Sequence, residues 1–222
     1  RPAIETGALF GTVSKVLDDV RLNGDEALRR YELEFDHVSL EKLNVEDGEF
    51  YEAVNYIPED LKKAIDVAYS NIHKFHSAQR FEEIKVETSP GVTCIQRSVP
   101  ISKVGLYIPG GTAPLFSTVL MLAIPAKIAG CSEIVLCSPP DRNGKINPYI
   151  LYAARIAGVT NVYKVGGAQA VAAMAYGTES VPKVDKIFGP GNQYVVAAKQ
   201  LVSLSDVAID MPAGPSEVEV LA

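Results

Sequence analysis

The chain has 222 residues, of which 47% are hydrophobic, and its 21 basic and 27 acidic residues give a net charge of −6. This hydrophobic content suffices for a sizeable core in one or two domains, and an acidic balance without a lysine- or arginine-rich run argues against nucleic acid as a partner. The longest apolar stretch, residues 115–128, is shorter than the roughly 20 residues that cross a bilayer and is interrupted by Pro125 and Lys127. We therefore expect no membrane segment and no signal peptide.

The three cysteines are Cys94, Cys131 and Cys137, an odd number without the spacing of a metal site. Cys137 falls within an apolar run, which favours a position in the core. We interpret the cysteines as reduced thiols of a cytoplasmic protein, because disulfides are rare in that compartment.

The N-terminal part of the chain is charged and predicts mainly helices. Helices are expected over residues 8–22, which end at the helix stop Asn23-Gly24, over residues 25–36, and over residues 59–79 after Pro58. The last of these carries an apolar stripe that must be covered within the chain or by another subunit. Its members are Leu61, Ile65, Ala68, Ile72 and Phe75.

A β-hairpin is predicted to connect the two halves of the chain. Residues 82–88 and 92–98 are short strand-like runs joined by Ser89-Pro90-Gly91. Because the sequence pattern changes near residue 98, we predict two domains, namely a helical region with the hairpin over residues 1–98 and a second domain over residues 99–222.

The second domain repeats a pattern of strand, turn and helix at intervals of about 25 residues. Parallel strands require such crossovers, and right-handed crossovers place helices on both faces of the sheet. The fold class is therefore predicted to be α/β, with a Rossmann-like, doubly wound parallel sheet. The expected strands are 102–107, 133–138, 161–165, 184–188, 205–209 and 217–221, and the expected helices are 114–129, 147–157, 168–176 and 191–203.

Three glycine-rich turns follow strands of this sheet: Pro109-Gly110-Gly111, Gly166-Gly167-Ala168 and Gly189-Pro190-Gly191. In a parallel sheet such turns share one edge, where helix N-termini can hold a ligand. No G-x-G-x-x-G fingerprint is present, and one glycine-rich turn alone is explained by its backbone conformation. Three turns, each beside a polar or aromatic residue, favour a ligand crevice.

The same turns belong to longer strings that closely resemble histidinol dehydrogenase. The strings are NGDEALRRYELEFD (23–36), VGLYIPGGTAPLFSTVLMLAIPAKIAG (104–130), VGGAQAVAAMAYGTESVPKVDKIFGPGNQYVVAAK (165–199) and DMPAGPSEVEVLA (210–222). The resemblance covers essentially the whole chain. It implies a zinc-dependent, homodimeric enzyme that oxidises L-histidinol through L-histidinaldehyde to L-histidine with two NAD, at the end of histidine biosynthesis.

Carried over by motif, the resemblance implies NAD contacts at Tyr107, Gln169 and Asn192 and a substrate contact at Ser216. A tyrosine at the end of a strand can stack on a nucleotide or hydrogen-bond to it, and neutral amides near helix N-termini suit a pyrophosphate. Plainer roles stay open: an edge tyrosine, a helix-start glutamine, an asparagine N-cap and a turn serine.

Groups for proton transfer and metal binding are scarce in this sequence. Residues 98–222 contain no histidine, and the three histidines are His37, His73 and His76. His73 and His76 could share a metal, but no third ligand is apparent nearby, and we interpret them as part of a partly solvated helix face. The resemblance places the zinc ligands and a Glu-His acid/base pair beyond residue 222, so no catalytic or metal residue is assigned here. We expect part of a longer polypeptide, inactive alone, because the chain stops within the apolar run 218–222.

Two other functions are compatible with the pattern. An aldehyde-dehydrogenase-like enzyme would need an activated cysteine at a helix N-terminus, where neither Cys131 nor Cys137 is expected. A non-enzymatic module could bind a nucleotide weakly or offer its helical face to a partner.

Overall fold

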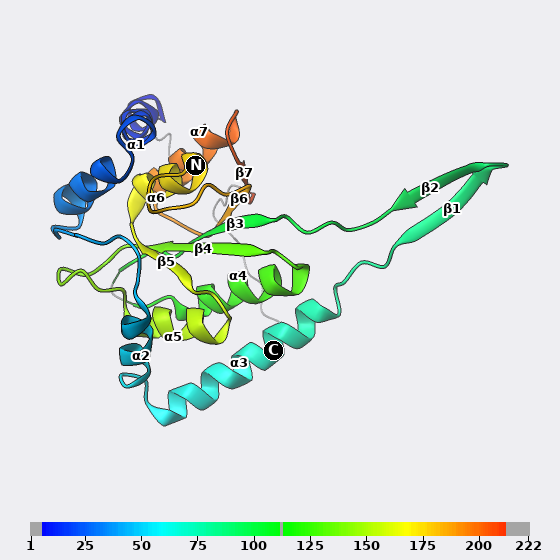
Figure 1. The fold of residues 1–222 in the computed structure, drawn as a ribbon, viewed down its shortest axis with the longest axis horizontal. Helices are drawn as coiled ribbons and strands as arrows, with labels where there is room; N and C mark the ends of the chain where they lie inside the picture. Colours follow the sequence, from blue (N-terminus) through cyan, green and yellow to red (C-terminus); the bar gives the residue numbers. More distant parts are fainter. Residues whose placement is uncertain (1–5, 112, 212–222) are drawn as a thin grey trace, which may run out of the picture.

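The computed structural model describes residues 6–111 and 113–211, and its centre is a five-stranded parallel sheet with helices on both faces (Figure 1). The strand order β5-β4-β3-β6-β7 reverses at β3, so successive crossovers run in opposite directions from the middle of the sheet. This arrangement confirms the predicted α/β class. The strands are β3 (Lys103–Tyr107), β4 (Glu133–Ser138), β5 (Asn161–Lys164), β6 (Lys186–Phe188) and β7 (Ala208–Ile209).

The crossover helices divide between the two faces. Helices α4 (Phe116–Ala129) and α5 (Pro148–Ile156) share a core with one face, and α6 (Gly167–Tyr176) and α7 (Gln193–Ser203) share a core with the other. Alternation along the strands feeds both cores, since successive side chains of a strand point to opposite faces. In β4, for example, Leu136 joins the α4 and α5 core, whereas Val135 and Cys137 join the α6 and α7 core.

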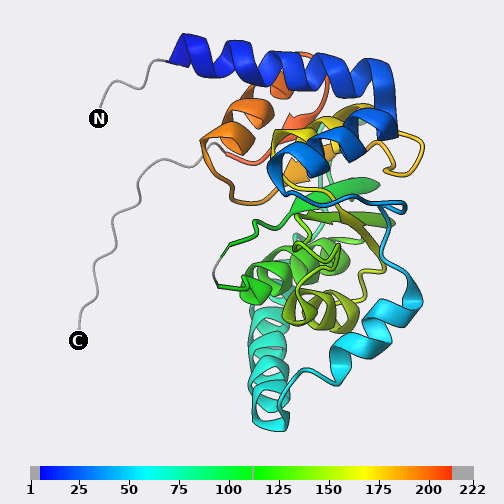
Figure 2. The same cartoon turned by 90° about the vertical axis from the view of Figure 1, so that its left-hand side faces the viewer.

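The N-terminal helices form a further layer on each face (Figure 2). Helix α1 (Thr6–Phe35) packs on α6 and α7, α2 (Asp47–Val54) packs on α5, and α3 (Glu59–Ser77) packs on α4. Both hydrophobic cores thus contain residues from before and after residue 98. The division into domains at that position stays a prediction.

The apolar stripe of α3 is covered within the chain. Ile65 is buried, and Leu61, Ala68 and Ile72 pack against the core that contains α4. Phe75, the last member of the stripe, is 64% exposed. A second subunit is therefore not required to cover the first four members.

Helix α1 bends at Gly24, where the sequence predicted a break between two helices. Gly24 has φ 52° and ψ −131°, a conformation that residues with a Cβ rarely adopt. A Cβ there would also lie 2.4 Å from Oε2 of Glu179. The same Glu179 oxygen accepts a hydrogen bond of 2.8 Å from the backbone N–H of Asp25, so the bend brings the second half of α1 against the loop after α6.

The Asp25 carboxylate is the main polar link between α1 and that loop. It is buried and accepts hydrogen bonds from the hydroxyl of Thr178 (2.7 Å) and from both the N–H (3.1 Å) and the hydroxyl (2.5 Å) of Ser180. Burial by itself raises the pKa of Asp25, but the hydrogen bonds from Ser180 and Thr178 outweigh it, and the pKa lies below its ordinary value. The carboxylate is consequently charged at neutral pH.

Helix α2 was not predicted. It has only 8 residues, too few for a convincing helical period, and its start depends on a reciprocal capping box between Glu46 and Glu49. The segment before it runs antiparallel to the edge strand β5, with hydrogen bonds from Val45 N to Val162 O (2.8 Å) and from Lys164 N to Leu43 O (2.7 Å). These contacts cover the edge of the sheet. The predicted strand 217–221 lies outside the described residues.

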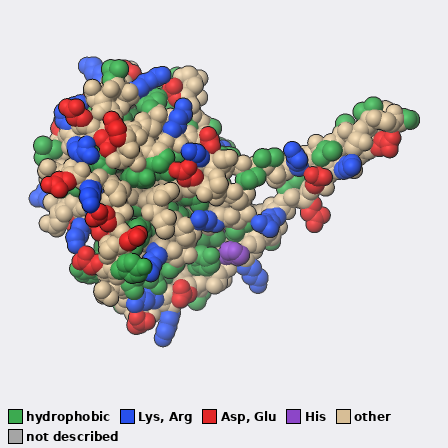
Figure 3. Space-filling view, viewed as in Figure 1, with side chains coloured by type: hydrophobic (Ala, Val, Ile, Leu, Met, Phe, Trp, Pro, Cys, Tyr) green, Lys and Arg blue, Asp and Glu red, His purple; other side chains and the backbone are tan. Residues whose placement is uncertain are grey.

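The predicted hairpin is confirmed as β1 (Ile84–Ser89) and β2 (Val92–Gln96), an antiparallel pair. Every residue of both strands is exposed, and the hairpin extends away from the body of the molecule (Figure 1, Figure 3). Among the helices of the described residues, none has the length and apolarity to cross a membrane.

Replacing Asp25 with alanine is expected to lower the free energy of unfolding by on the order of 2–4 kcal/mol, because the buried N–H of Ser180 and two hydroxyls lose their acceptor. Urea denaturation at neutral pH measures this loss. The matched control is Glu26→Ala, one residue along and exposed, which is expected to change the free energy of unfolding by less than about 0.5 kcal/mol. Equal losses in the two variants would contradict the assigned role of Asp25.

Candidate functional site

A cleft of about 1240 Å³ lies at the carboxyl edge of the sheet. The turns after β3, β4, β5 and β6 all reach it, as expected where the strand order of a doubly wound sheet reverses. Binding pockets for small molecules are typically about 300–1,000 Å³, so this cleft has room for an extended ligand. Lining residues from the turns include Pro109, Gly110, Pro139, Asp141, Gly167, Gln169 and Asn192.

Tyr107, the last residue of β3, lines the floor of the cleft and is 3% exposed. Its hydroxyl oxygen accepts a hydrogen bond of 3.2 Å from the backbone N–H of Gly167, at the start of α6. Burial raises the pKa of Tyr107 above its ordinary value, so the hydroxyl keeps its proton and can still donate it to a ligand.

Gln169 lies in the first turn of α6 and is 1% exposed, yet it borders the same cleft. Its amide nitrogen donates a hydrogen bond of 3.1 Å to Oε1 of Glu32, which also accepts the N–H of Gly166 at 3.1 Å. Tyr107 and Glu32 together therefore hold the start of α6.

Asn192 is the N-cap of α7, one of the plainer roles left open by the sequence. Its side-chain oxygen accepts hydrogen bonds from the N–H groups of Tyr194 (3.0 Å) and Val195 (3.1 Å). Asn192 is exposed and lines the cleft, so its amide group is accessible to a ligand there. The structure brings Tyr107, Gln169 and Asn192 to one cleft, as the common edge predicted, whereas Ser216 lies outside the described residues.

The turn before Asn192 is anchored by a buried lysine that the sequence analysis did not identify. Lys199 Nζ donates a hydrogen bond of 2.8 Å to the carbonyl of Gly189 and forms an ion pair with Asp210, which accepts the N–H of Gly189 at 2.9 Å. Gly189 has φ 126°, and a Cβ there would lie 2.1 Å from the carbonyl oxygen of Tyr107. Only glycine allows β6 and β3 to approach this closely where they enter the cleft.

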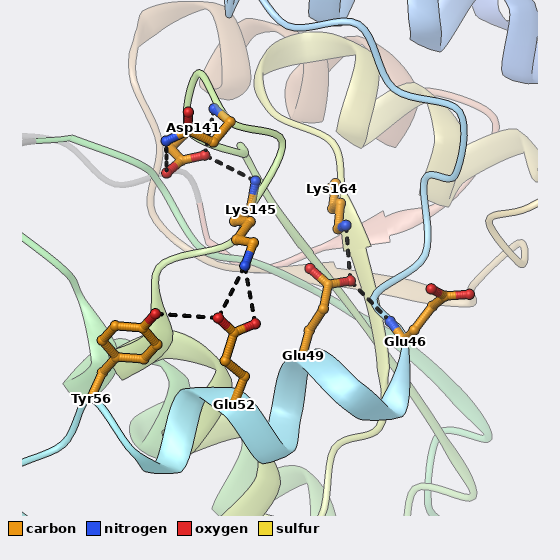
Figure 4. Close-up of polar contacts among 8 residues, drawn as sticks. Glu46, Glu49, Glu52, Tyr56, Asp141, Lys145 and Lys164 are labelled. Carbon is orange, nitrogen blue, oxygen red and sulfur yellow. Dashed lines mark hydrogen bonds and ion pairs between the residues drawn. The ribbon is translucent and has the colours of Figure 1, made fainter.

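Charged side chains along the α2 side of the cleft are paired (Figure 4). Glu49 lies 2.9 Å from Nζ of Lys164, and Glu52 lies 3.0 Å from Nζ of Lys145. The hydrogen bond with Lys145 also holds the pKa of Glu52 below its ordinary value. Asp141 is engaged in its own turn, where it accepts the N–H of Lys145 at 2.9 Å. This wall therefore carries compensated charges.

Glu32 differs from these carboxylates because it has no cationic partner among the described residues. It is fully buried, and its second oxygen, Oε2, accepts no hydrogen bond from any of them. Burial raises the pKa of Glu32 to about 8, and the nearby negative charge of Asp36 contributes to this rise. Burial also raises the pKa of Asp36, which lines the cleft. The raised pKa favours the protonated form of Glu32 at neutral pH.

The position of Glu32 on its helix could have indicated from the sequence that this residue is buried. The residue lies four positions after Leu28, which is buried, and a charge at that spacing falls on the apolar stripe of the helix. A charged residue on a buried stripe indicates either a hydrogen-bonded partner or a neutralised carboxyl.

Neither an active cysteine nor a metal centre is assembled in the described part of the chain. Cys137 is fully buried, burial raises the pKa of both the Cys137 and Cys131 thiols, and neither lines the cleft. This geometry argues against an aldehyde-dehydrogenase-like nucleophile. Within the described ranges no three histidine, cysteine or acidic side chains gather as metal ligands, so these residues do not fit the zinc that the resemblance implies.

A parallel sheet with this strand order and a ligand-sized cleft at its switch point defines a Rossmann-like, doubly wound α/β class of protein. The family model described as histidinol dehydrogenase matches residues 1–222, and the chain belongs to the histidinol dehydrogenase family.

Named relatives agree with this family over the whole chain. Histidinol dehydrogenase of Bacteroides fragilis is 67% identical over 222 residues, which are 100% of this chain and 52% of the relative. The protein of that name from Escherichia coli (strain K12) is 56% identical over 225 residues, covering 100% of this chain and 51% of the relative. The crystal structure of histidinol dehydrogenase from Elizabethkingia anophelis superposes with a TM-score of 0.94 at 50% identity, over 97% of this chain and 50% of that one. The chain thus spans about half the length of the curated relatives it matches.

Replacing Glu32 with glutamine is expected to stabilise the protein at alkaline pH. The pKa of this carboxyl is 4.5 when unperturbed, as in the unfolded chain, and about 8 in the folded protein. Between these pH values the folded state holds a proton that the unfolded state has lost. The free energy of unfolding of the wild type therefore falls as the pH rises from 4.5 to about 8. The variant needs no proton, so its advantage is expected to grow from pH 4.5 to about 8 and reach about 5 kcal/mol.

Thermal or urea unfolding of both proteins across this pH range measures the difference. Glu34→Gln, which removes an exposed carboxylate from the same helix, is the matched control and is expected to follow the wild type. The same pH dependence in the wild type and in the Glu32 variant would contradict the assignment of a proton to Glu32.

Proposed function

We propose that this chain is the cofactor-binding part of a histidinol dehydrogenase that oxidises L-histidinol with NAD. The observation that carries the proposal is the convergence of Tyr107, Gln169 and Asn192 on one cleft at the carboxyl edge of the parallel sheet. Family membership supports the same reading. The cleft is large enough for a dinucleotide, and its neutral amides and hydroxyl suit phosphate and ribose oxygens.

The three residues would act by binding and orienting NAD. The Tyr107 hydroxyl would donate to a cofactor oxygen while it continues to accept from Gly167. The amide nitrogen of Asn192 would donate to a phosphate or ribose oxygen, because the amide oxygen is already used in the cap. Gln169 would set the position of the α6 start, and bound NAD would accept the hydride that the substrate loses.

The remaining parts of the reaction are proposed to come from elsewhere in the enzyme. Ser216 would contact L-histidinol, and the zinc ligands and the acid/base pair would lie in the portion of the relatives that has no counterpart in these 222 residues. We also propose, from the family resemblance, that the intact enzyme is a cytoplasmic homodimer.

Isothermal titration of NAD into the 222-residue chain is expected to show saturable binding that Asn192→Asp weakens at least about tenfold. Aspartate keeps the acceptor for Tyr194 and Val195, so α7 remains capped, but it removes the N–H donor and adds a negative charge near the dinucleotide phosphates. Circular dichroism and the melting temperature verify that the variant folds like the wild type.

The matched control for this titration is Asn161→Asp. Asn161 is exposed at the start of β5, at the opposite edge of the sheet, so its substitution is expected to leave NAD affinity unchanged. Absence of binding by the folded wild-type chain, or equal affinities of the wild type and Asn192→Asp, would contradict the proposed site.

The chain by itself is expected to form no NADH from NAD and L-histidinol, because the described residues bring no three histidine, cysteine or acidic side chains together as a metal centre that could polarise the alcohol. An absorbance assay for NADH, run on a preparation whose NAD binding has been measured, checks this outcome. NADH formation above the rate without protein would overturn it.

A further inference from the structure

The start of α6 rests on a carboxyl group that the proposed reaction does not use. Glu32 Oε1 accepts both the N–H of Gly166 and the amide of Gln169, whereas Oε2 is buried and accepts no hydrogen bond among the described residues. Asp36, the residue after the end of α1, borders the cleft and lies beside Gly166, where a Cβ would be 3.3 Å from Oδ2 of Asp36. Two carboxyl groups therefore meet at one helix N-terminus.

Among the described residues, no buried cation compensates this pair. The titratable groups that face Glu32 are Asp36 directly after α1, Tyr107 on β3 and Cys137 on β4, all of which are neutral or negative, and α6 contributes only the uncharged Gln169. His37, the exposed neighbour of Asp36, lowers the pKa of Asp36 through its charge, but burial outweighs this effect and the pKa of Asp36 stays above its ordinary value. Among the ion pairs of residues 6–111 and 113–211, none includes Glu32 or Asp36. Only one of the two carboxyls can ionise at low cost in such a setting.

We propose that Glu32 is a positioning residue for NAD: in its protonated form it holds Gln169 and the α6 start against the cofactor and shares its proton with Asp36, and loss of that proton weakens NAD binding. The inference rests on the cofactor site proposed above. The geometry supplies the reason, because a second carboxylate charge beside the α6 N-terminus repels the dinucleotide phosphates that this helix end would attract.

Proton binding and NAD binding are therefore coupled. Any ligand that prefers the protonated form must, by linkage, increase proton binding by the protein. Because the pKa of Glu32 is raised to about 8, NAD is expected to bind with uptake of protons near pH 8 and with falling affinity above it.

Calorimetric titration of NAD tests this coupling in the wild-type chain, Glu32→Gln and the surface control Glu34→Gln. Titrations at about pH 6.5 and about pH 9 give the change in Kd, and titrations near pH 8 in two buffers with different ionisation enthalpies give the protons taken up. Glutamine has the shape of the protonated carboxyl: its oxygen can accept from Gly166 and Gln169, and its amide can donate to Asp36.

The wild type and Glu34→Gln are expected to bind NAD about tenfold more weakly at the higher pH and to take up protons. Glu32→Gln is expected to bind with nearly the same Kd at both pH values, without this uptake. Asp36→Asn is expected to shift the loss of affinity to lower pH, because it removes the charge that helps Glu32 keep its proton.

The remaining outcomes distinguish a failure of the proton coupling from a failure of the proposed NAD site. If the wild type binds NAD with the same Kd at both pH values, or if Glu32→Gln retains the wild-type dependence, the inference is wrong and the cofactor site stands. If the folded wild-type chain binds no NAD at about pH 6.5, the proposed function fails and the coupling fails with it.

Discussion

Helix α1 is attached to the sheet by two buried carboxyl groups, and the shape of the cleft depends on both. Asp25 holds the loop after α6, and Glu32 holds the first turn of α6 itself. A buried carboxyl is costly unless its oxygens receive hydrogen bonds, so each group constrains the distance between α1 and its partner more tightly than apolar packing does. The N-terminal helix thereby becomes part of the cleft wall.

The cost of burying a carboxyl group is offset differently at Asp25 and at Glu32. Asp25 receives three hydrogen bonds from Thr178 and Ser180 and keeps its charge. Glu32 receives two through one oxygen, receives none on the other from the residues that the structure describes, and has a raised pKa that favours its protonated form. The difference follows from the number of donors that the neighbouring elements present, and it places the one uncompensated acidic pair of the described cleft beside the helix end proposed to meet NAD.

Much of the fold could be predicted because the relevant signals are local. The strands β3, β5 and β6 are short apolar runs before glycine-rich turns, and parallel strands must share their carboxyl edge, which was enough to place Tyr107, Gln169 and Asn192 together. Helix α2 escaped prediction because its start depends on a capping box and its stability on packing against α5. The raised pKa of Glu32 could not be predicted, because it depends on burial and on the proximity of Asp36, which only the folded chain creates.

By itself, the sequence determined the alternation of strands and helices after residue 101, the break at Gly24 and the edge at which a ligand can bind, since periodicity, glycine positions and the geometry of parallel crossovers act over short stretches of chain. Only the tertiary structure decided that α4 covers the stripe of α3, that Lys199 anchors the turn before Asn192, and that Glu32 is buried without a cation. Those outcomes depend on desolvation and on contacts between residues far apart in the chain, neither of which a local pattern records.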